Sequence, residues 1–409
     1  MPSSFSLRWV AVGVFVISST LNYLDRTLLN TLAPLIMLEF QLNMAGFGAL
    51  LSAFSIAYAA STLAAGWMLD RFGINRGISA AVGWWSAAAA STGLIGSLAG
   101  LTICRVALGI GESAGIPATG KVNGVYLKPE ERALGAAANQ IGLSLSAPLA
   151  ALSIGIASAH GWRLPFIVSG LAGFLWIPLW LAVSARVRPQ YAIQERTPRS
   201  RFGLLRERNL LLLVVANVLW MGAYSLWSNW TTLYLTHVHH LSLEATARYV
   251  WIPPLISNLG GFFGGWLSLR WMKRAVEPVT ARRRAVWVSA AGSLLTLLLP
   301  LATGAGWATV LISSSFFFAL AGSVNIYALP IDIYGANHSG VAIAALTCAF
   351  AILQAVISPL IGYLADHQLY TQVVWLVTLP LIASSVVLQG LKINESEGES
   401  QTVKQLDYQ

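Results

Sequence analysis

Twelve apolar segments, each long enough to cross a bilayer as a helix, constrain the fold of this 409-residue chain. A helix needs about 20 mainly apolar residues to span the hydrocarbon core. Charged residues make up only 10% of the chain, whereas a soluble domain carries about 25%. We therefore expect an all-α integral membrane protein. The segments lie at 9–38, 46–69, 77–97, 99–123, 132–158, 162–184, 209–236, 245–270, 284–304, 306–329, 338–365 and 370–390.

The longest polar stretch divides these segments into two sets of six. It covers residues 185–208, is rich in arginine and contains Pro189 and Pro198. The sequence thus predicts an N-terminal six-helix bundle at 1–184, a cytoplasmic linker at 185–208, a C-terminal six-helix bundle at 209–391 and a polar tail at 392–409.

The net charge of +9 is distributed as in a multi-pass membrane protein. If the amino terminus is cytoplasmic, nearly all basic residues fall on the cytoplasmic side, and only Arg163 and Arg248 fall outside. This asymmetry follows the positive-inside rule and predicts that both termini are cytoplasmic. Because membrane topology accounts for the basic residues, we expect no nucleic-acid partner. The two cysteines, Cys104 and Cys348, lie in apolar segments with no metal-ligand spacing, so we expect no metal or other cofactor.

Four charges interrupt the apolar segments: Asp25 and Arg26 in the first, and Arg105 and Glu112 in the fourth. A charge at bilayer depth costs about 2.5–3.5 kcal/mol even on the gentler insertion scales. Arg105 and Glu112 are about two helical turns apart and share one face. Asp25 and Arg26 point about 100° apart, so one can face a cavity while the other contacts a neighbouring helix. Two interpretations are open: a substrate and proton pathway, or a structural network of buried ion pairs.

The two sets of segments contain a weak internal repeat. Gly66-Trp67 after the second segment and Gly265-Trp266 after the eighth are each followed by an arginine, Arg71 or Arg270. Repeats of this kind build many secondary transporters, which bind substrate between the two halves.

Three motifs carry a resemblance to a known family. Gly66-x-x-x-Asp70-Arg71-x-Gly73-x-x-Arg76 resembles the loop signature of the major facilitator superfamily. Asn22-Tyr23-x-Asp25-Arg26 and Arg105-x-x-x-Gly109-x-x-Glu112-x-x-x-x-Pro117 resemble its anion:cation symporter family. That family holds bacterial sugar-acid and aromatic-acid permeases and animal vesicular and lysosomal organic-anion transporters. The resemblance implies two six-helix bundles around a central cavity. The chain departs from the pattern at Leu269, where an acid is usual, and around 341–347, where an asparagine is usual.

The resemblance also implies roles for individual residues. Asp25 and Glu112 would be the proton-coupling acids, and Arg26 or Arg105 would bind the substrate anion. Asp70, Arg71 and Arg76 would form a cytoplasmic latch that gates transport. Further candidates for substrate binding are polar or amphipathic residues inside the segments, for which helix packing is the competing interpretation. They are Tyr23, Tyr58, Asn139, Gln140, Tyr224, Trp227 and Thr347.

These features together predict a proton-coupled symporter of an organic carboxylate, such as a sugar acid or aromatic acid. We expect a monomer in a bacterial inner membrane. The alternative is a proton-driven exporter of a drug or metabolite on the same fold. An enzyme is not expected, because the esterase-like pattern Gly111-Glu112-Ser113-Ala114-Gly115 lies in an apolar helix and lacks the strand–turn–helix that a nucleophile elbow needs.

Two groups of ionisable residues keep alternative interpretations. Asp332 is either a third titrating or gating group or an ordinary acid at a helix end. His237, His239 and His240 are either a weak metal site or pH sensor, or part of a solvated external loop.

Overall fold

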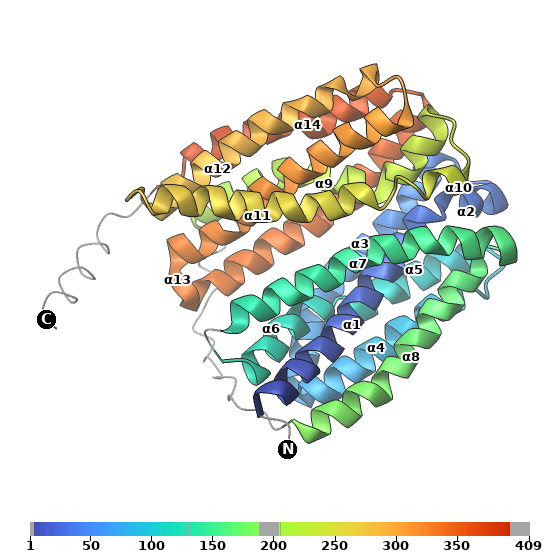
Figure 1. The fold of residues 1–409 in the computed structure, drawn as a ribbon, viewed down its shortest axis with the longest axis horizontal. Helices are drawn as coiled ribbons and strands as arrows, with labels where there is room; N and C mark the ends of the chain where they lie inside the picture. Colours follow the sequence, from blue (N-terminus) through green and yellow to red (C-terminus); the bar gives the residue numbers. More distant parts are fainter. Residues whose placement is uncertain (1–3, 129–130, 188–203, 205, 393–409) are drawn as a thin grey trace, which may run out of the picture.

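A computed structural model describes residues 4–128, 131–187, 204 and 206–392, so most of the expected linker and nearly all of the expected tail lie outside the described residues. The first eight helices form one bundle, which we call the N-half (Figure 1). They are α1 (Ser4–Thr31), α2 (Ala33–Phe40), α3 (Met44–Phe72), α4 (Ile74–Thr92), α5 (Leu98–Glu112), α6 (Gly115–Tyr126), α7 (Arg132–His160) and α8 (Arg163–Arg186).

The remaining helices form a second bundle, the C-half (Figure 1). They are α9 (Arg208–Val238), α10 (Leu243–Thr246), α11 (Ile252–Met272), α12 (Pro278–Ser293), the 3-10 helix η3 (Leu294–Leu301), α13 (Ala305–Asp366) and α14 (Tyr370–Gln389). Within α13, two apolar stretches, Ala305–Tyr334 and Val341–Asp366, are each long enough to cross a membrane. Helix α9 contacts both, through the carbonyl oxygens of Ala319 and Leu346.

The predicted all-α architecture of twelve spanning helices is confirmed. In the part of the chain that the structure describes, ten stretches are long and apolar enough to cross a membrane. The other two are α4, of 19 residues, and α11, of 21 residues. At 1.5 Å per residue their lengths are about 28 and 31 Å, which matches the hydrocarbon core.

Prolines account for two differences from the predicted boundaries. The first segment, predicted at 9–38, is divided into α1 and the short α2, because Pro34 lacks the N–H that would continue α1. The eighth, predicted to begin at 245, begins as α11 only at Ile252. Pro253 and Pro254 follow at once, and proline is well tolerated in the first turn of a helix.

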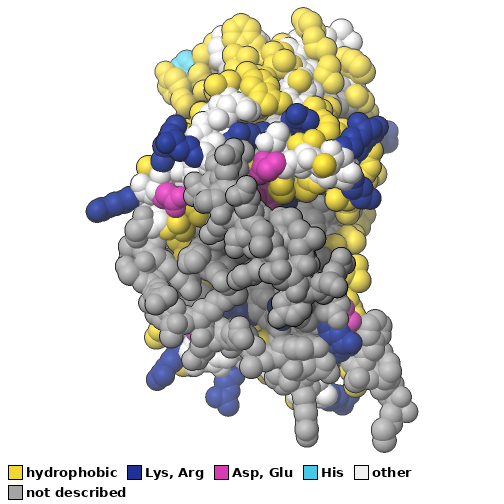
Figure 2. Space-filling model, turned by 90° about the vertical axis from the view of Figure 1, so that its left-hand side faces the viewer, with side chains coloured by type: hydrophobic (Ala, Val, Ile, Leu, Met, Phe, Trp, Pro, Cys, Tyr) yellow, Lys and Arg dark blue, Asp and Glu magenta, His cyan; other side chains and the backbone are white. Residues whose placement is uncertain are grey.

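The two halves meet at one end and separate toward the other (Figure 1). We call the end with Arg186 and Arg208 the linker end and the end with α2 and α10 the far end. One continuous apolar core joins the C-half to the far-end residues of α1, α3 and α8, including Leu29, Phe47 and Phe166. The rest of the N-half has a core of its own around Trp176 and Trp180. Lys and Arg side chains lie on both halves at the linker end (Figure 2).

Close contact between α3 and the second stretch of α13 seals the far end. A Cβ atom on Gly48 would lie 2.5 Å from the carbonyl oxygen of Ser358, so only glycine fits there. The Ser52 hydroxyl donates to the carbonyl of Ala355 at 2.5 Å. Between α1 and α9, the Asn30 amide donates to Asn229 Oδ1 at 3.0 Å.

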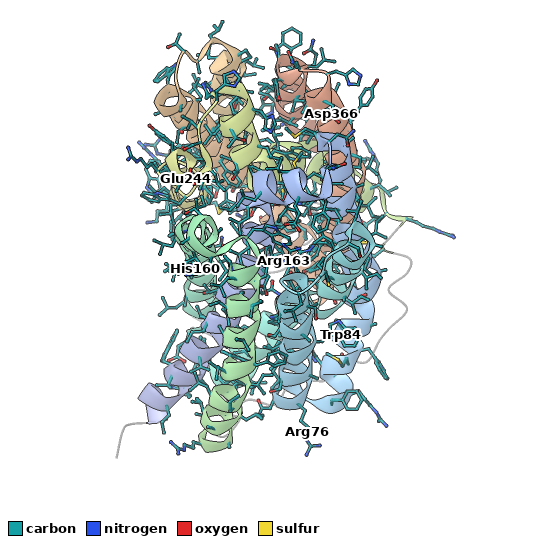
Figure 3. The ribbon with its side chains drawn as sticks, turned by 90° about the vertical axis from the view of Figure 1, so that its right-hand side faces the viewer. Arg76, Trp84, His160, Arg163, Glu244 and Asp366 are labelled. Carbon is teal, nitrogen blue, oxygen red and sulfur yellow. The ribbon has the colours of Figure 1, made fainter. Side chains whose placement is uncertain are left out.

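Asp366 completes this closure by capping a helix of the other half. Its carboxylate accepts from the backbone N–H groups of Met44 and Ala45, at 2.8 and 3.0 Å. These N–H groups open α3 and have no partner within the helix, so a carboxylate there both satisfies them and complements the helix dipole. Asp366 on the C-half is visible at the far end in Figure 3, as is Arg163 on the N-half.

Gly48→Val should open the far end. The added side chain would overpack the α3–α13 contact at a cost of about 1–3 kcal/mol, which shifts a two-state equilibrium by about 5- to 150-fold. A cysteine at Ser55, which is 2% exposed beneath this contact, should then react faster with a maleimide in a Cys104→Ser, Cys348→Ser background. The control is Gly155→Val, because nothing lies within 4 Å of a Cβ at Gly155. Equal labelling rates in both variants would contradict the closure.

Glu39 ties α2 to the start of α8 within the N-half. It accepts from Arg163 Nη2 at 2.5 Å, Arg163 Nη1 at 2.8 Å and Trp162 Nε1 at 2.6 Å. Hydrogen bonds from Arg163, and then from Trp162, hold the pKa of the Glu39 carboxyl below its usual range. The pair therefore stabilises the fold above the unfolded-state pKa of about 4.3, and that stability is lost as pH falls through the lower folded-state pKa.

Glu39→Gln should accordingly lower the melting temperature at pH 7. The difference from the parent protein should shrink as pH falls below about 4, because the parent carboxylate is then protonated as well. Glu244→Gln, at the same end of the molecule, is the control and should show no such pH dependence. A difference that stays constant from neutral to acid pH would show that the Glu39 charge has no stabilising role.

Candidate functional site

A break in the fourth spanning segment positions Glu112. The segment was predicted as one helix at 99–123, but α5 ends at Glu112 and α6 begins at Gly115. Pro117 lacks the N–H that would bond to the carbonyl of Ser113, so regular helix cannot pass through this point. On α5, Gly109 and Gly111 permit close packing, because a Cβ at either would meet α3 or α4 within 3 Å.

One face of α1 lines the principal cavity of the N-half. Phe15, Ser18, Ser19, Asn22 and Arg26 recur at the spacing of one helical stripe. Together with residues of α3, α4, α6 and α7 they enclose about 250 Å³. The cavity lies on the linker-end side of Arg26. Its other lining residues are Tyr23, Tyr58, Ile78, Trp85, Gly115, Ile116, Thr119, Asn139, Gln140 and Leu143.

Arg26 is the cation of this cavity. Its Nε donates to Glu112 Oε2 at 2.5 Å. Its guanidinium carbon lies 4.7 to 5.1 Å from the ring centroids of Tyr23, Phe54 and Tyr58, which is cation–π distance. The side chain keeps 25% of its surface exposed, whereas Glu112 is fully buried. A ligand in the cavity can therefore reach the guanidinium without first reaching the carboxylate.

Asp25 and Arg105 lie behind this pair, away from the cavity. Asp25 is 1% exposed and accepts a hydrogen bond from the Ser169 hydroxyl of α8. Arg105 is also 1% exposed; it packs over the Phe166 ring and reaches Thr92 at 3.5 Å. Asp25 and Glu112 both lie within electrostatic range of Arg105. The adjacent Asp25 and Arg26 thus do point to different surroundings: Arg26 to the cavity and Asp25 to a neighbouring helix.

A smaller cavity of about 50 Å³ lies on the far-end side of Arg26. It reaches Arg105 and is bordered by Asn30 and Asn229, the residues that join the two halves. Arg26 lines both cavities. The space is large enough for a few water molecules.

The C-half brings aromatic residues near this site, although every residue that lines the principal cavity belongs to the N-half. Tyr224 packs against Phe316 and Phe350, with ring centroids 5.0 and 6.1 Å apart. It lies within electrostatic range of Arg26 and Tyr23. Tyr327 lies within range of Tyr23 and Tyr58. Thr347 lies close to Tyr327, and its hydroxyl donates to the carbonyl of Ile343 at 2.9 Å.

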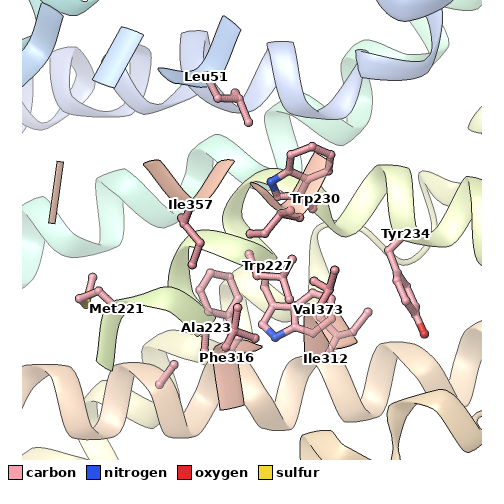
Figure 4. Packing of buried hydrophobic residues seen from close by; sticks show 14 of the residues in the cluster. Leu51, Met221, Ala223, Trp227, Trp230, Tyr234, Ile312, Phe316, Ile357 and Val373 are labelled. Atoms are coloured by element: carbon pink, nitrogen blue, oxygen red, sulfur yellow. The ribbon is translucent and has the colours of Figure 1, made fainter. Parts of the chain in front are cut away.

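The other predicted binding residues fall into two places. Asn139 and Gln140 line the cavity; Asn139 accepts from Ser19 at 2.6 Å, and Gln140 donates to Asn258 of the C-half at 3.2 Å. Trp227 lies instead in the C-half core (Figure 4). It is 2% exposed, and its indole N–H donates to Ser315 at 2.8 Å, so it does not face the cavity.

The residues of the predicted latch, and Asp332, lie near the ends of the bundles. Asp70 pairs with Lys121 of the same half, and Arg71 and Arg76 are exposed. Asp332 pairs with Arg282, also within one half.

The three histidines at the end of α9 lie at the far end. Burial, followed by the nearby His240, lowers the pKa of His239. Within the described residues, no group of three His, Cys, Asp or Glu side chains could hold a metal ion.

Sequence reasoning missed several residues that complete the site. Phe54 and Ser169 contact Arg26 and Asp25, yet a phenylalanine or serine in an apolar helix carries no signal of its own. Asn22 was quoted only as part of a motif. Its Nδ2 is buried without a hydrogen-bond partner among the described residues, which leaves a donor at the cavity wall.

Comparison with known proteins gives consistent results. The Major Facilitator Superfamily model matches residues 15–347. The hexuronate transporter of Escherichia coli K12 is 26% identical over 382 residues, covering 88% of each chain. The probable sulfoacetate transporter SauU of Cupriavidus necator is 28% identical over 394 residues, covering 90% of this chain and 89% of that protein.

The structural comparison supports the fold. The crystal structure of a bacterial homologue of the human lysosomal transporter Spinster, in an inward-facing and unoccupied conformation, has a TM-score of 0.71 at 18% identity. It covers 93% of this chain, and 95% of that chain is matched. The predicted resemblance to a family of organic-anion permeases is thus confirmed by the relatives. The chain belongs to the Major Facilitator Superfamily.

Proposed function

We propose that this protein is a proton-coupled symporter of an organic carboxylate in a bacterial inner membrane. The observation that carries the proposal is the Arg26–Glu112 ion pair, in which a fully buried acid holds a partly exposed arginine at the wall of a cavity. The similar transporters of hexuronate and of sulfoacetate both act on acids, which supports a carboxylate as substrate.

The coupling follows from competition for one guanidinium. An arginine fork binds a carboxylate well, whether that carboxylate belongs to Glu112 or to a substrate. When Glu112 accepts a proton, its hold on Arg26 weakens and Arg26 becomes free for the substrate. When a substrate carboxylate displaces Glu112, the acid is left buried without its partner, and burial favours its neutral form. Proton and substrate therefore bind together.

Asp25 and Arg105 support this exchange from behind. Arg105 lies within electrostatic range of both acids, so it offsets part of their negative charge in either state. Ser169 fixes the Asp25 carboxylate against α8. We propose Asp25 as a second proton-accepting group that acts inside the N-half, without contacting substrate.

The direction of opening follows from charge. The positive-inside rule places the arginine-rich linker end in the cytoplasm. The far end, sealed by Gly48, Ser52 and Asp366, then faces outward. The structure would be the inward-open state, and rocking of the halves about the site would open the far end. Asp70, Arg71 and Arg76 would gate the cytoplasmic side.

Glu112→Gln should abolish uptake driven by a proton gradient into proteoliposomes but keep exchange of substrate across the membrane. The amide is close in size to the acid and cannot carry the proton. The measurement compares uncoupler-sensitive accumulation with counterflow of a labelled organic acid. Glu244→Gln, at the far end and exposed, is the matched control and should accumulate substrate normally. Full proton-driven accumulation by Glu112→Gln would rule out its coupling role.

Arg26→Ala should lose both accumulation and counterflow, because Arg26 is the one cation among the described residues that lines the principal cavity. Arg26→Lys keeps the charge but not the bidentate fork, and should retain weak binding with affinity reduced about tenfold or more. Competition by unlabelled substrate measures both effects. An Arg26→Ala protein that still exchanges substrate would show that the buried charges are structural.

A further inference from the structure

Every charge near the middle of the membrane belongs to the N-half. The C-half segments 210–236, 252–269, 285–331, 341–365 and 370–391 contain no Asp, Glu, Lys, Arg or His. Asp332 and Arg282, at the linker end of the C-half, are paired with each other. The two halves therefore offer a substrate very different surroundings.

The part of the C-half near Arg26 and Tyr23, which we call the C-half wall, contains the aromatic residues Tyr224 and Tyr327, although neither lines the principal cavity itself. Tyr224 packs at an angle against Phe316 and Phe350, and Tyr327 lies close to Thr347. Asn217 is also close, but its amide N–H donates to the backbone of Leu346 at 3.0 Å. An anionic group held against this wall would meet ring faces, which carry partial negative charge, and no cation.

Nor does the N-half supply a second cation. Arg105 is 1% exposed and lies within electrostatic range of Asp25 and Glu112, so a ligand in the principal cavity cannot reach it. Arg26 alone lines that cavity among the described arginines and lysines. The polar groups beside it, such as Ser18, Asn22 and Gln140, suit hydroxyl groups better than a second carboxylate.

We propose that the substrate is a monocarboxylate: its single charge binds Arg26, and its neutral body lies between the polar N-half wall and the tyrosines of the C-half. Acids with a second carboxylate are rejected, because that group would be desolvated without a partner. This inference rests on the proposed function and narrows its substrate class. The similar proteins include transporters of galactarate and glucarate as well as of hexuronate, so their names do not decide the charge of the substrate.

The test uses pairs of acids of similar size that differ in charge. Binding of galacturonate and galactarate, benzoate and phthalate, and lactate and tartronate to the purified protein would be measured by calorimetry at neutral pH. At least one monoacid should bind, and its diacid partner should bind about 100-fold more weakly or worse. Arg26→Ala should lose the monoacid binding.

A substitution can add a cation to the C-half side of the site. Thr347→Lys places an ammonium group on the C-half wall, and Thr347→Met is a control of similar length without charge. The lysine variant should reduce the ratio of monoacid affinity to diacid affinity by about tenfold, whereas the methionine variant should leave this ratio unchanged. If the lysine variant fails to fold, the acid pairs on the parent protein decide the question alone.

The outcomes separate the two proposals. If a diacid binds the parent protein as tightly as the monoacid it is paired with, the proposal of a monocarboxylate substrate is wrong, and the symporter proposal still stands. If none of the six acids binds the folded parent protein, the result contradicts transport of organic acids, and with it the proposal of a monocarboxylate substrate.

Discussion

The ion pair between Arg26 and Glu112 is the interaction on which the rest of the site depends. It lies among spanning helices that are largely apolar, so removing either charge would leave the other buried without its direct partner. Three aromatic rings surround the guanidinium, and the break between α5 and α6 sets the position of the acid. Asp25 and Arg105 add a second layer of opposite charges behind it.

The same arginine joins the chemistry to the architecture. It borders both a cavity of about 250 Å³ on the linker-end side and one of about 50 Å³ on the far-end side. The far-end cavity is bordered by Asn30 and Asn229, which hold the two halves together. A change in the partner of Arg26 therefore occurs beside the contacts that must break for the far end to open. This proximity gives ligand binding a physical route to bias the two states.

The sequence predicted those features that depend on local chemistry. Apolar length predicted the spanning helices, and the adjacency of Asp25 and Arg26 predicted their different surroundings. Prolines at 34, 117 and 253 were visible, yet their effects on the helix boundaries were not anticipated. The contacts between the halves could not be predicted, because Gly48 and Ser358 are far apart in the chain and ordinary in type. Trp227 looked suited to a binding site but packs with Ser315, since an amphipathic side chain serves either purpose.

Proton uptake on substrate binding tests the central claim most directly. Calorimetry of a bound monocarboxylate in buffers of different ionisation enthalpy counts the protons that the purified protein takes up. If the substrate displaces Glu112 from Arg26, the parent protein should take up about one proton per carboxylate bound at mildly alkaline pH, and Glu112→Gln about none. Binding to the parent protein without proton uptake at any pH would contradict competition for Arg26 as the basis of coupling.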